Sequence, residues 1–116
     1  MKARLLLAFV TIIPNVVRAD EAGQGYGVGM HSCAEFAKSY MANPTAAEDI
    51  YFTWAQGFMS GLNLSDAASG RAYKAINGGD MATQKAYIRS YCDVHPLAQY
   101  VGAIVQLYTT LPNAKP

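Results

Sequence analysis

The feature of this chain that most constrains its fold is an uncharged run in the middle of the sequence. No Asp, Glu, Lys or Arg occurs between Asp49 and Asp66, and the run contains the single tryptophan, Trp54, and two glycines, Gly57 and Gly61. Such a run is typical of a membrane helix, of a ligand-binding segment or of a helix buried in a small domain. It is shorter than the roughly 20 residues that a transmembrane helix needs, and polar residues interrupt it. We therefore expect a buried helix.

The two glycines lie four residues apart, so on a helix they share one face. Each glycine lowers helix propensity by about 1 kcal/mol relative to alanine, and close approach of a neighbouring helix would compensate for that loss. We therefore predict that Trp54, Gly57 and Gly61 form a helix-packing surface, with Ile50 and Phe58 on the same apolar stripe. The alternative is that the glycine face is a ligand groove.

The first residues of the chain predict an export signal. Lys2 and Arg4 precede a mostly apolar run that ends before Ala19, a pattern typical of a cleavable secretory signal peptide over residues 1–19. The run is too short to span a bilayer, and an uncleaved anchor or a buried strand are the alternatives. We expect the mature protein, residues 20–116, to be periplasmic and to have no integral membrane segment.

The expected mature chain is a single domain with few charges. Residues 20–116 carry six Lys/Arg and eight Asp/Glu, a formal charge of −2. The basic residues do not form a run, so nucleic acid and anionic membranes are poor partners. A domain of this size buries only about two thirds of its unfolded surface, so a covalent brace would help to stabilise it.

The chain contains two cysteines, Cys33 and Cys92, and in an exported protein a disulfide between them is the expected state. Closing this loop would stabilise the fold by about 4 kcal/mol. With His31 and His95, the same cysteines also provide the ligand set of a structural zinc site. The spacing of His31 and Cys33 is awkward for binding one metal, so we expect the disulfide and no metal or cofactor. Zinc and free thiols are the alternatives.

The glycine-rich segment 20–31 predicts a flexible leader and lacks the spacing and context of a nucleotide-binding loop. We expect a helical domain over residues 32–112 and a short tail over 113–116.

Capping signals and apolar periodicity predict four helices. N-cap signals stand at Ser32, Thr45 and Asp80, the first two with a Glu three residues later. Pro96 should end the third helix and begin the fourth, with Leu97 on its apolar face, because proline is tolerated at the first helical position. No segment shows sustained strand alternation, so we expect an all-α, compact single-domain bundle of four helices. The expected helices cover about 32–41, 45–63, 80–95 and 96–111.

Residues suited to catalysis are few, and we expect no enzymatic activity. Neither histidine has a plausible nucleophile near it in the sequence, and both cysteines are expected to form the disulfide. The carboxylates of Glu48 and Asp49 lie in a first helical turn, where they stabilise the helix dipole. The connection between the second and third helices carries Arg71, Tyr73 and Lys74. Because Arg and Tyr are enriched at interface hot spots, these three are the candidate partner-binding residues. A merely solvated loop is the alternative.

The segment YIRSYCDVHPLAQYVGAIVQLY (87–108) resembles the C-terminal half of the Tai family. The spacing of Trp54, Gly57 and Gly61 is also similar to that family, which commonly has more cysteines than this chain. Tai proteins are small, periplasmic, helical immunity proteins that neutralise amidase toxins delivered by type VI secretion. The resemblance implies a protein partner, a cell-wall-degrading toxin whose active-site cleft this chain would occupy. Formation of a homodimer is also open.

The size, the export signal and the single long disulfide also resemble the Hde-type acid-stress chaperones. Those chaperones are densely charged, whereas only 14 of residues 20–116 are charged here, six basic and eight acidic. The immunity role is therefore the favoured interpretation. A periplasmic chaperone that binds unfolding clients at low pH is the alternative.

Overall fold

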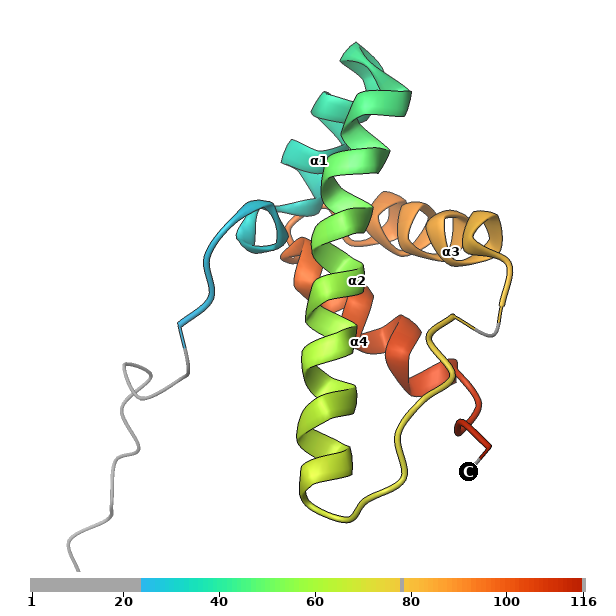
Figure 1. Ribbon diagram of the computed structural model, residues 1–116. Coiled ribbons are helices and arrows are strands. Elements are labelled where there is room, and N and C mark those ends of the chain that lie inside the picture. The colour runs from blue at the N-terminus through green and yellow to red at the C-terminus, as the bar shows by residue number, and fades with distance from the viewer. Residues whose placement is uncertain (1–23, 78, 116) are drawn as a thin grey trace, which may run out of the picture.

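The computed structural model describes residues 24–77 and 79–115, which form four α-helices preceded by a short 3-10 helix (Figure 1). The elements are η2 (Val28–Met30), α1 (Cys33–Ala42), α2 (Pro44–Ala68), α3 (Met81–Val94) and α4 (Tyr100–Thr110). The expected fold class, an all-α bundle of four helices, is confirmed. Within the described ranges, no helix combines the length and the hydropathy needed to cross a membrane. The expected signal peptide, 1–19, and the first leader residues, 20–23, lie outside those ranges.

α1 begins where its capping box predicts and takes further hydrogen bonds from the connection before α4. The reciprocal capping box of Ser32 and Glu35 is present. The Cys33 N–H donates to the Ala98 carbonyl at 2.8 Å, and the next N–H along the helix donates to the Pro96 carbonyl at 2.9 Å. The first N–H groups of a helix have no partner within the helix. The connection between α3 and α4 therefore completes the cap of α1.

This pairing explains why α4 begins later than the sequence predicts. The expected start at Pro96, with Leu97 in the core, is wrong: α4 begins at Tyr100, and Leu97 is 93% exposed. Because the Pro96 carbonyl accepts from α1, residues 96–99 form a turn along α1. The Tyr100 N–H completes the pairing by donating to the His31 carbonyl at 2.8 Å.

α2 also begins at a different cap. The sequence predicted Thr45, but the side-chain oxygen of Asn43 accepts an N–H of the first turn at 3.1 Å, and Pro44 is the first helical residue. Asn is a strong N-cap, and proline at the first position has no N–H that needs a partner. Glu48, which was expected to complete a capping box with Thr45, forms an ion pair with Arg89 of α3.

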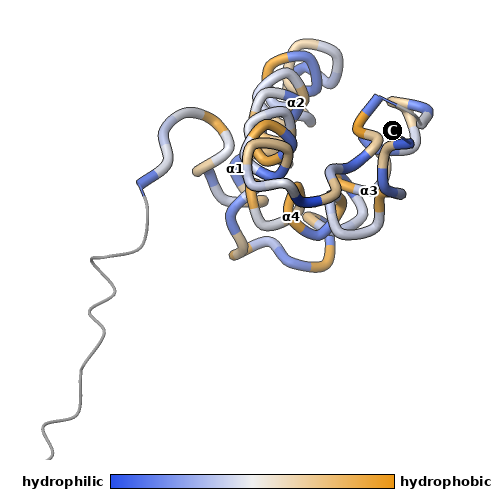
Figure 2. The backbone as a smooth tube through the Cα atoms, turned by 60° about the horizontal axis from the view of Figure 1, so that its bottom comes forward, coloured by the Kyte–Doolittle hydropathy of each residue, from blue (hydrophilic) through white to orange (hydrophobic). Residues whose placement is uncertain are grey.

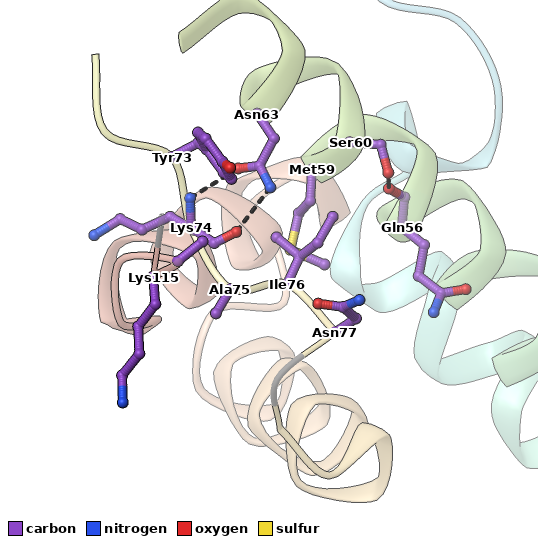
Figure 3. Close-up of a pocket in the computed structure, with 11 residues that line it drawn as sticks. Gln56, Met59, Ser60, Asn63, Tyr73, Lys74, Ala75, Ile76, Asn77 and Lys115 are labelled. Atoms are coloured by element: carbon purple, nitrogen blue, oxygen red, sulfur yellow. Dashed lines mark hydrogen bonds between the residues drawn. The ribbon is translucent and has the colours of Figure 1, made fainter. Parts of the chain in front are cut away.

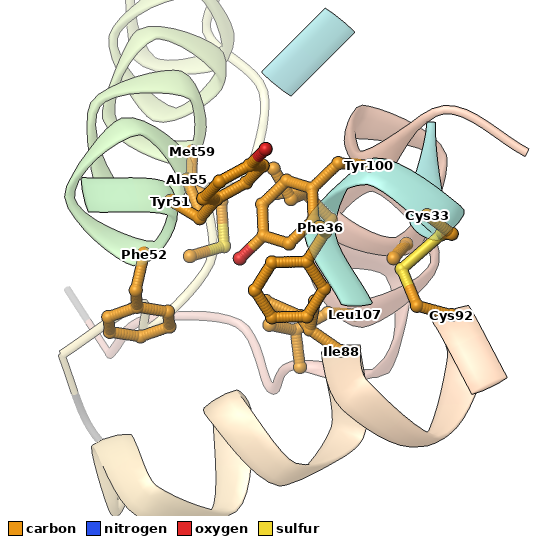
Figure 4. Packing of buried hydrophobic residues seen from close by; sticks show 12 residues of the cluster. Cys33, Phe36, Tyr51, Phe52, Ala55, Met59, Ile88, Cys92, Tyr100 and Leu107 are labelled. Carbon is orange, nitrogen blue, oxygen red and sulfur yellow. A yellow bond between two sulfur atoms is a disulfide. The ribbon is translucent and has the colours of Figure 1, made fainter. Parts of the chain in front are cut away.

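The core is centred on three aromatic rings from three helices (Figure 4). Phe36 of α1, Tyr51 of α2 and Tyr100 of α4 have ring centroids 4.9–5.0 Å apart in all three pairs. Each such contact contributes about 0.5–1.5 kcal/mol beyond the burial of its area. The predicted disulfide between Cys33 and Cys92 is confirmed, and it joins α1 to α3 with their Cα atoms 4.9 Å apart. Other buried members of this cluster are Phe52, Ala55, Met59, Ile88, Ala103, Ile104 and Leu107.

Hydrophobic and hydrophilic segments alternate along the helices, as expected of amphipathic helices (Figure 2). On α2 the buried face carries Tyr51, Ala55 and Met59. This differs from the predicted stripe, because Ile50 is 59% exposed and Trp54 is only half-buried.

The segment before α1 covers Trp54, which corrects the prediction of a flexible leader for residues 24–31. The Trp54 Nε1–H donates to the Tyr26 carbonyl at 2.9 Å. Gly29 is buried, and a Cβ at this position would overlap the indole ring. Gly27 has φ +93°, and a Cβ there would lie 2.8 Å from Trp54 Nε1. Glycine is needed at both positions because the backbone lies directly on the indole.

Gly57 and Gly61 do not form the helix contact that the sequence predicted. Both are exposed, and a Cβ placed on either would meet no atom within 4 Å. The helix-packing prediction is therefore wrong for both glycines. Trp54 packs instead on the leader and on Phe58, whose ring is stacked on the indole with centroids 5.5 Å apart.

We expect Gly29→Ala to destabilise the fold and Gly61→Ala to stabilise it. The new Cβ at position 29 would overlap the Trp54 ring, and overpacking of this kind lowers the free energy of unfolding by about 1–3 kcal/mol. At position 61 the space is open, so the higher helix propensity of alanine should add up to about 1 kcal/mol. Urea unfolding of the two variants measures both changes. A destabilised Gly61→Ala variant would show that this face is covered.

Candidate binding site

The last turns of α2 and the loop after it extend away from α1 and α3 (Figure 1). α2 continues beyond its predicted end to Ala68 and stops with a Schellman motif. Gly70 has the left-handed φ of +69° that this motif requires, and the Arg71 N–H donates to the Asp66 carbonyl at 2.9 Å. The motif satisfies carbonyls at the end of α2 and fixes the direction in which the chain leaves. We call residues 64–72 the α2 tip.

A network of polar side chains braces the α2 tip. The Arg71 guanidinium donates to Asp66 Oδ1 from Nε at 2.9 Å and from Nη2 at 2.8 Å. The Tyr108 hydroxyl of α4 lies 3.0 Å from Asp66 Oδ2 and 2.8 Å from Asn63 Oδ1, and it can donate to either oxygen. The hydrogen bonds from Arg71, and then that from Tyr108, lower the pKa of Asp66. Burial, and then the hydrogen bond to Asp66, raise the pKa of Tyr108, so this hydroxyl keeps its proton.

Two amide side chains hold the loop that follows the α2 tip. Asn63 Oδ1 accepts from the Lys74 N–H at 3.0 Å, and Asn63 Nδ2–H donates to the Lys74 carbonyl at 2.8 Å (Figure 3). The Asn63 amide thus bonds Lys74 as a neighbouring strand would. Further along, the buried Gln84 of α3 donates from Nε2 to the Ile76 carbonyl at 3.1 Å. The loop is therefore attached to α2 at one point and to α3 at another.

The C-terminal segment covers the other edge of this loop. Lys74 and Asn113 form an antiparallel bridge, and two backbone hydrogen bonds of 2.8 and 2.9 Å join residues 73–75 to residues 112–114. Residues 113–115 were expected to be a tail outside the domain. They are instead part of the structure that holds the loop.

Together, α2, the loop and the C-terminal segment line a groove of about 680 Å³ (Figure 3). We call it the α2–loop groove. Its described lining residues carry amides, hydroxyls, two ammonium groups and apolar side chains, and they include no carboxylate, imidazole or thiol. These groups can bind a ligand through charge, hydrogen bonds and apolar contact. The lining residues are Gln56, Met59, Ser60, Asn63, Tyr73, Lys74, Ala75, Ile76, Asn77, Ala114 and Lys115.

The structure brings together two of the three predicted partner-binding residues. Tyr73 and Lys74 both line the α2–loop groove, and Tyr73 is 41% exposed. Arg71 lies on the α2 tip, where its guanidinium pairs with Asp66. Sequence analysis missed Asn63, because the helix was expected to end at this residue and its partners, Lys74 and Tyr108, lie 11 and 45 positions away in sequence.

The alternative of a zinc site built from His31, Cys33, Cys92 and His95 is wrong. The disulfide leaves neither cysteine a thiolate to offer a metal. His31 Nδ1 lies 2.8 Å from the Tyr51 hydroxyl. In the part of the chain that the structure describes, no group of three or more His, Cys, Asp or Glu side chains could hold a metal ion.

In comparisons with known proteins, the chain matches no protein-family model, no curated protein and no solved structure. The residues that resemble the Tai family, 87–108, run from α3 through the connection into α4. They supply one half of the disulfide and the core residues Ile88, Tyr100 and Ile104. At the end of this segment, Tyr108 braces the α2 tip.

We expect Asn63→Ala to loosen the loop while the helices stay folded. The substitution removes both side-chain hydrogen bonds to partly buried Lys74, which should lower the free energy of unfolding by about 1–3 kcal/mol. Amide hydrogen exchange at Lys74 should accelerate accordingly. Asn77→Ala, an exposed position on the same groove, is the control and should change stability by no more than about 0.5 kcal/mol. Unchanged exchange at Lys74 in Asn63→Ala would show that the two hydrogen bonds from the Asn63 side chain, the Asn63 clamp, do not hold the loop.

The Asp66 network predicts a specific loss of stability in acid. Because the fold lowers the pKa of Asp66, its carboxylate stabilises the fold at pH values above its ordinary pKa of 3.8. This stabilisation is lost as the pH falls through the lowered pKa of the folded state. Asp66→Asn should therefore reduce the fall in melting temperature below pH 3.8, whereas Asp93→Asn on the exposed side of α3 serves as the control. An equally steep fall in Asp66→Asn would argue against the network.

Proposed function

We propose that this chain is an exported, non-catalytic binding protein that neutralises a cell-wall-degrading enzyme by placing the α2 tip in the enzyme's active-site cleft. The observation that carries this proposal is the pre-organised form of the tip. It projects from the bundle and is held by the Schellman motif at Gly70, by the Asp66 network and by the Asn63 side chain. Ordering a loop on binding costs free energy, so a loop that is already fixed binds more tightly.

The chemistry of the α2 tip suits insertion into a cleft. Leu64 is 72% exposed and offers an apolar anchor, and the small residues that follow it, Ala67, Ala68 and Ser69, are also exposed. The charges of Asp66 and Arg71 are paired with each other. A burial of the tip would therefore leave neither of them as an uncompensated charge, which is the costly outcome at an interface.

The class of the partner rests on sequence. Residues 87–108 resemble the Tai family, whose members block amidase toxins, and the expected signal peptide would direct the chain to the compartment in which such toxins act. A disulfide is compatible with that oxidising compartment.

Protection against the enzyme encoded beside this gene is the direct test. Host cells that export this enzyme to the periplasm should lyse, and co-expression of the full chain should prevent lysis. Leu64→Glu on the α2 tip should abolish protection, whereas Leu97→Glu, on the exposed connection between α3 and α4, should not. A gene neighbourhood without a cell-wall-degrading enzyme, or lysis despite production of the folded chain, would contradict the immunity role.

The chaperone alternative has a separate readout. We expect the purified protein not to suppress aggregation of an unfolding client in strong acid, because the disulfide limits expansion of the acid state and the chain carries few charges. Suppression at near-stoichiometric amounts would replace the immunity role with the chaperone role.

A further inference from the structure

The basic side chains of the described residues fall into two groups. Residues 24–77 and 79–115 contain six Lys/Arg, and three of them form ion pairs there. These pairs are Arg71 with Asp66, Lys85 with Asp49 and Arg89 with Glu48. Lys74 and Lys115 belong to the other group, and both line the α2–loop groove, which has no carboxylate among its described lining residues. The groove is therefore positively charged.

The other groups of the groove are arranged around an apolar centre. Figure 3 shows Lys74 and Lys115 on one side, Gln56 and Asn77 on the other, and Ile76 between them, next to Met59, which is fully buried. An exposed pair of a lysine and a carboxylate contributes little by itself. An occupant that binds this groove therefore needs negative charge, an apolar group, and hydrogen-bonding groups for the Asn77 amide and for Gln56, whose Nε2 also donates to Met81 Sδ at 3.5 Å.

We propose that the α2–loop groove binds an extended acidic segment of the partner protein. Carboxylates of this segment pair with Lys74 and Lys115, and an apolar side chain packs on Ile76. The backbone of the segment forms hydrogen bonds with the side-chain amides of Gln56 and Asn77. In an extended chain, residues two positions apart point to the same side. A segment with an acidic and an apolar residue at alternate positions therefore presents both groups to the groove.

This inference rests on the proposed binding function. The acidic segment would lie on the partner's surface beside the cleft that the α2 tip enters. Asn63 uses only the N–H and carbonyl of Lys74. The Lys74 ammonium group adds to the hydrogen bonds from Arg71 in lowering the pKa of Asp66 but forms no ion pair among the described residues, so it can meet a carboxylate of the partner. Hydrogen bonds to the backbone of the loop thus fix the shape of the groove, whereas the side chains of Lys74 and Lys115, which take no part in those hydrogen bonds, give it its charge.

The inference is tested by NMR, with the protein purified after expression of the full chain. The protein is titrated with a capped peptide of Glu-Ser-Val-Ser repeats. Amide signals of residues 73–77 and the side-chain amides of Gln56 and Asn77 should shift. The matched peptide with Gln in place of Glu should bind at least about tenfold more weakly. Added salt should also weaken binding, because at 0.1 M it screens exposed charges beyond about 10 Å.

Charge reversal of the two lysines supplies the variants. The Lys74→Glu, Lys115→Glu protein should bind the acidic peptide at least about tenfold more weakly, and Lys115→Glu alone should show part of this loss. Lys38→Glu, an exposed position on α1, is the control and should bind as the unchanged protein does. Equal binding of the Gln peptide, shifts confined to other surfaces, or full binding by a folded double variant would each overturn the inference. The proposed function is scored separately, by cell protection with Leu64→Glu.

Discussion

The disulfide between Cys33 and Cys92 fixes α1 against α3, and we call these two helices the base of the fold. The disulfide holds α1 and α3 with their Cα atoms 4.9 Å apart, and the contacts of Phe36 with Tyr51 and Tyr100 attach α2 and α4 to the same base. The two cysteines are 59 positions apart in sequence, and the residues between them include all of α2 and the loop after it. The α2 tip and the loop after it, to which we assign binding, are therefore far in sequence from the disulfide. They need constraints of their own.

Those constraints reach the α2 tip through α4. Tyr100 packs in the aromatic core, and Tyr108, two turns further along the same helix, meets both Asn63 and Asp66. Asn63 then holds Lys74, so a continuous set of contacts links the core to the loop and to the α2–loop groove. Because each member of this set is hydrogen-bonded or packed, the loop has a defined shape without a partner. Binding by such a surface avoids much of the entropic cost of ordering a loop.

Sequence patterns that span only a few residues, such as N-caps and apolar spacing, predicted much of the fold. The N-caps of α1 and α3 and the presence of four helices follow from local spacing, and the disulfide follows from the expected export. Features set by distant parts of the chain were missed. The role given to Gly57 and Gly61, close backbone packing, belongs instead to glycines of the leader, because spacing on one helix does not tell which face another segment covers. Tyr73 and Lys74 could be selected from composition, and their role in binding stays a prediction. Asn63 could not be selected, since Tyr108 lies 45 positions away in sequence.

The central claim is that the loop between α2 and α3 is ordered in the free protein and presents a fixed binding surface. Backbone ¹⁵N relaxation of the unbound protein measures this most directly. If the contacts of Asn63, Gln84 and Tyr108 hold the loop, residues 71–77 should have order parameters close to those of the helices, about 0.85. Order parameters below about 0.6 over these residues would show a flexible loop and would contradict the account.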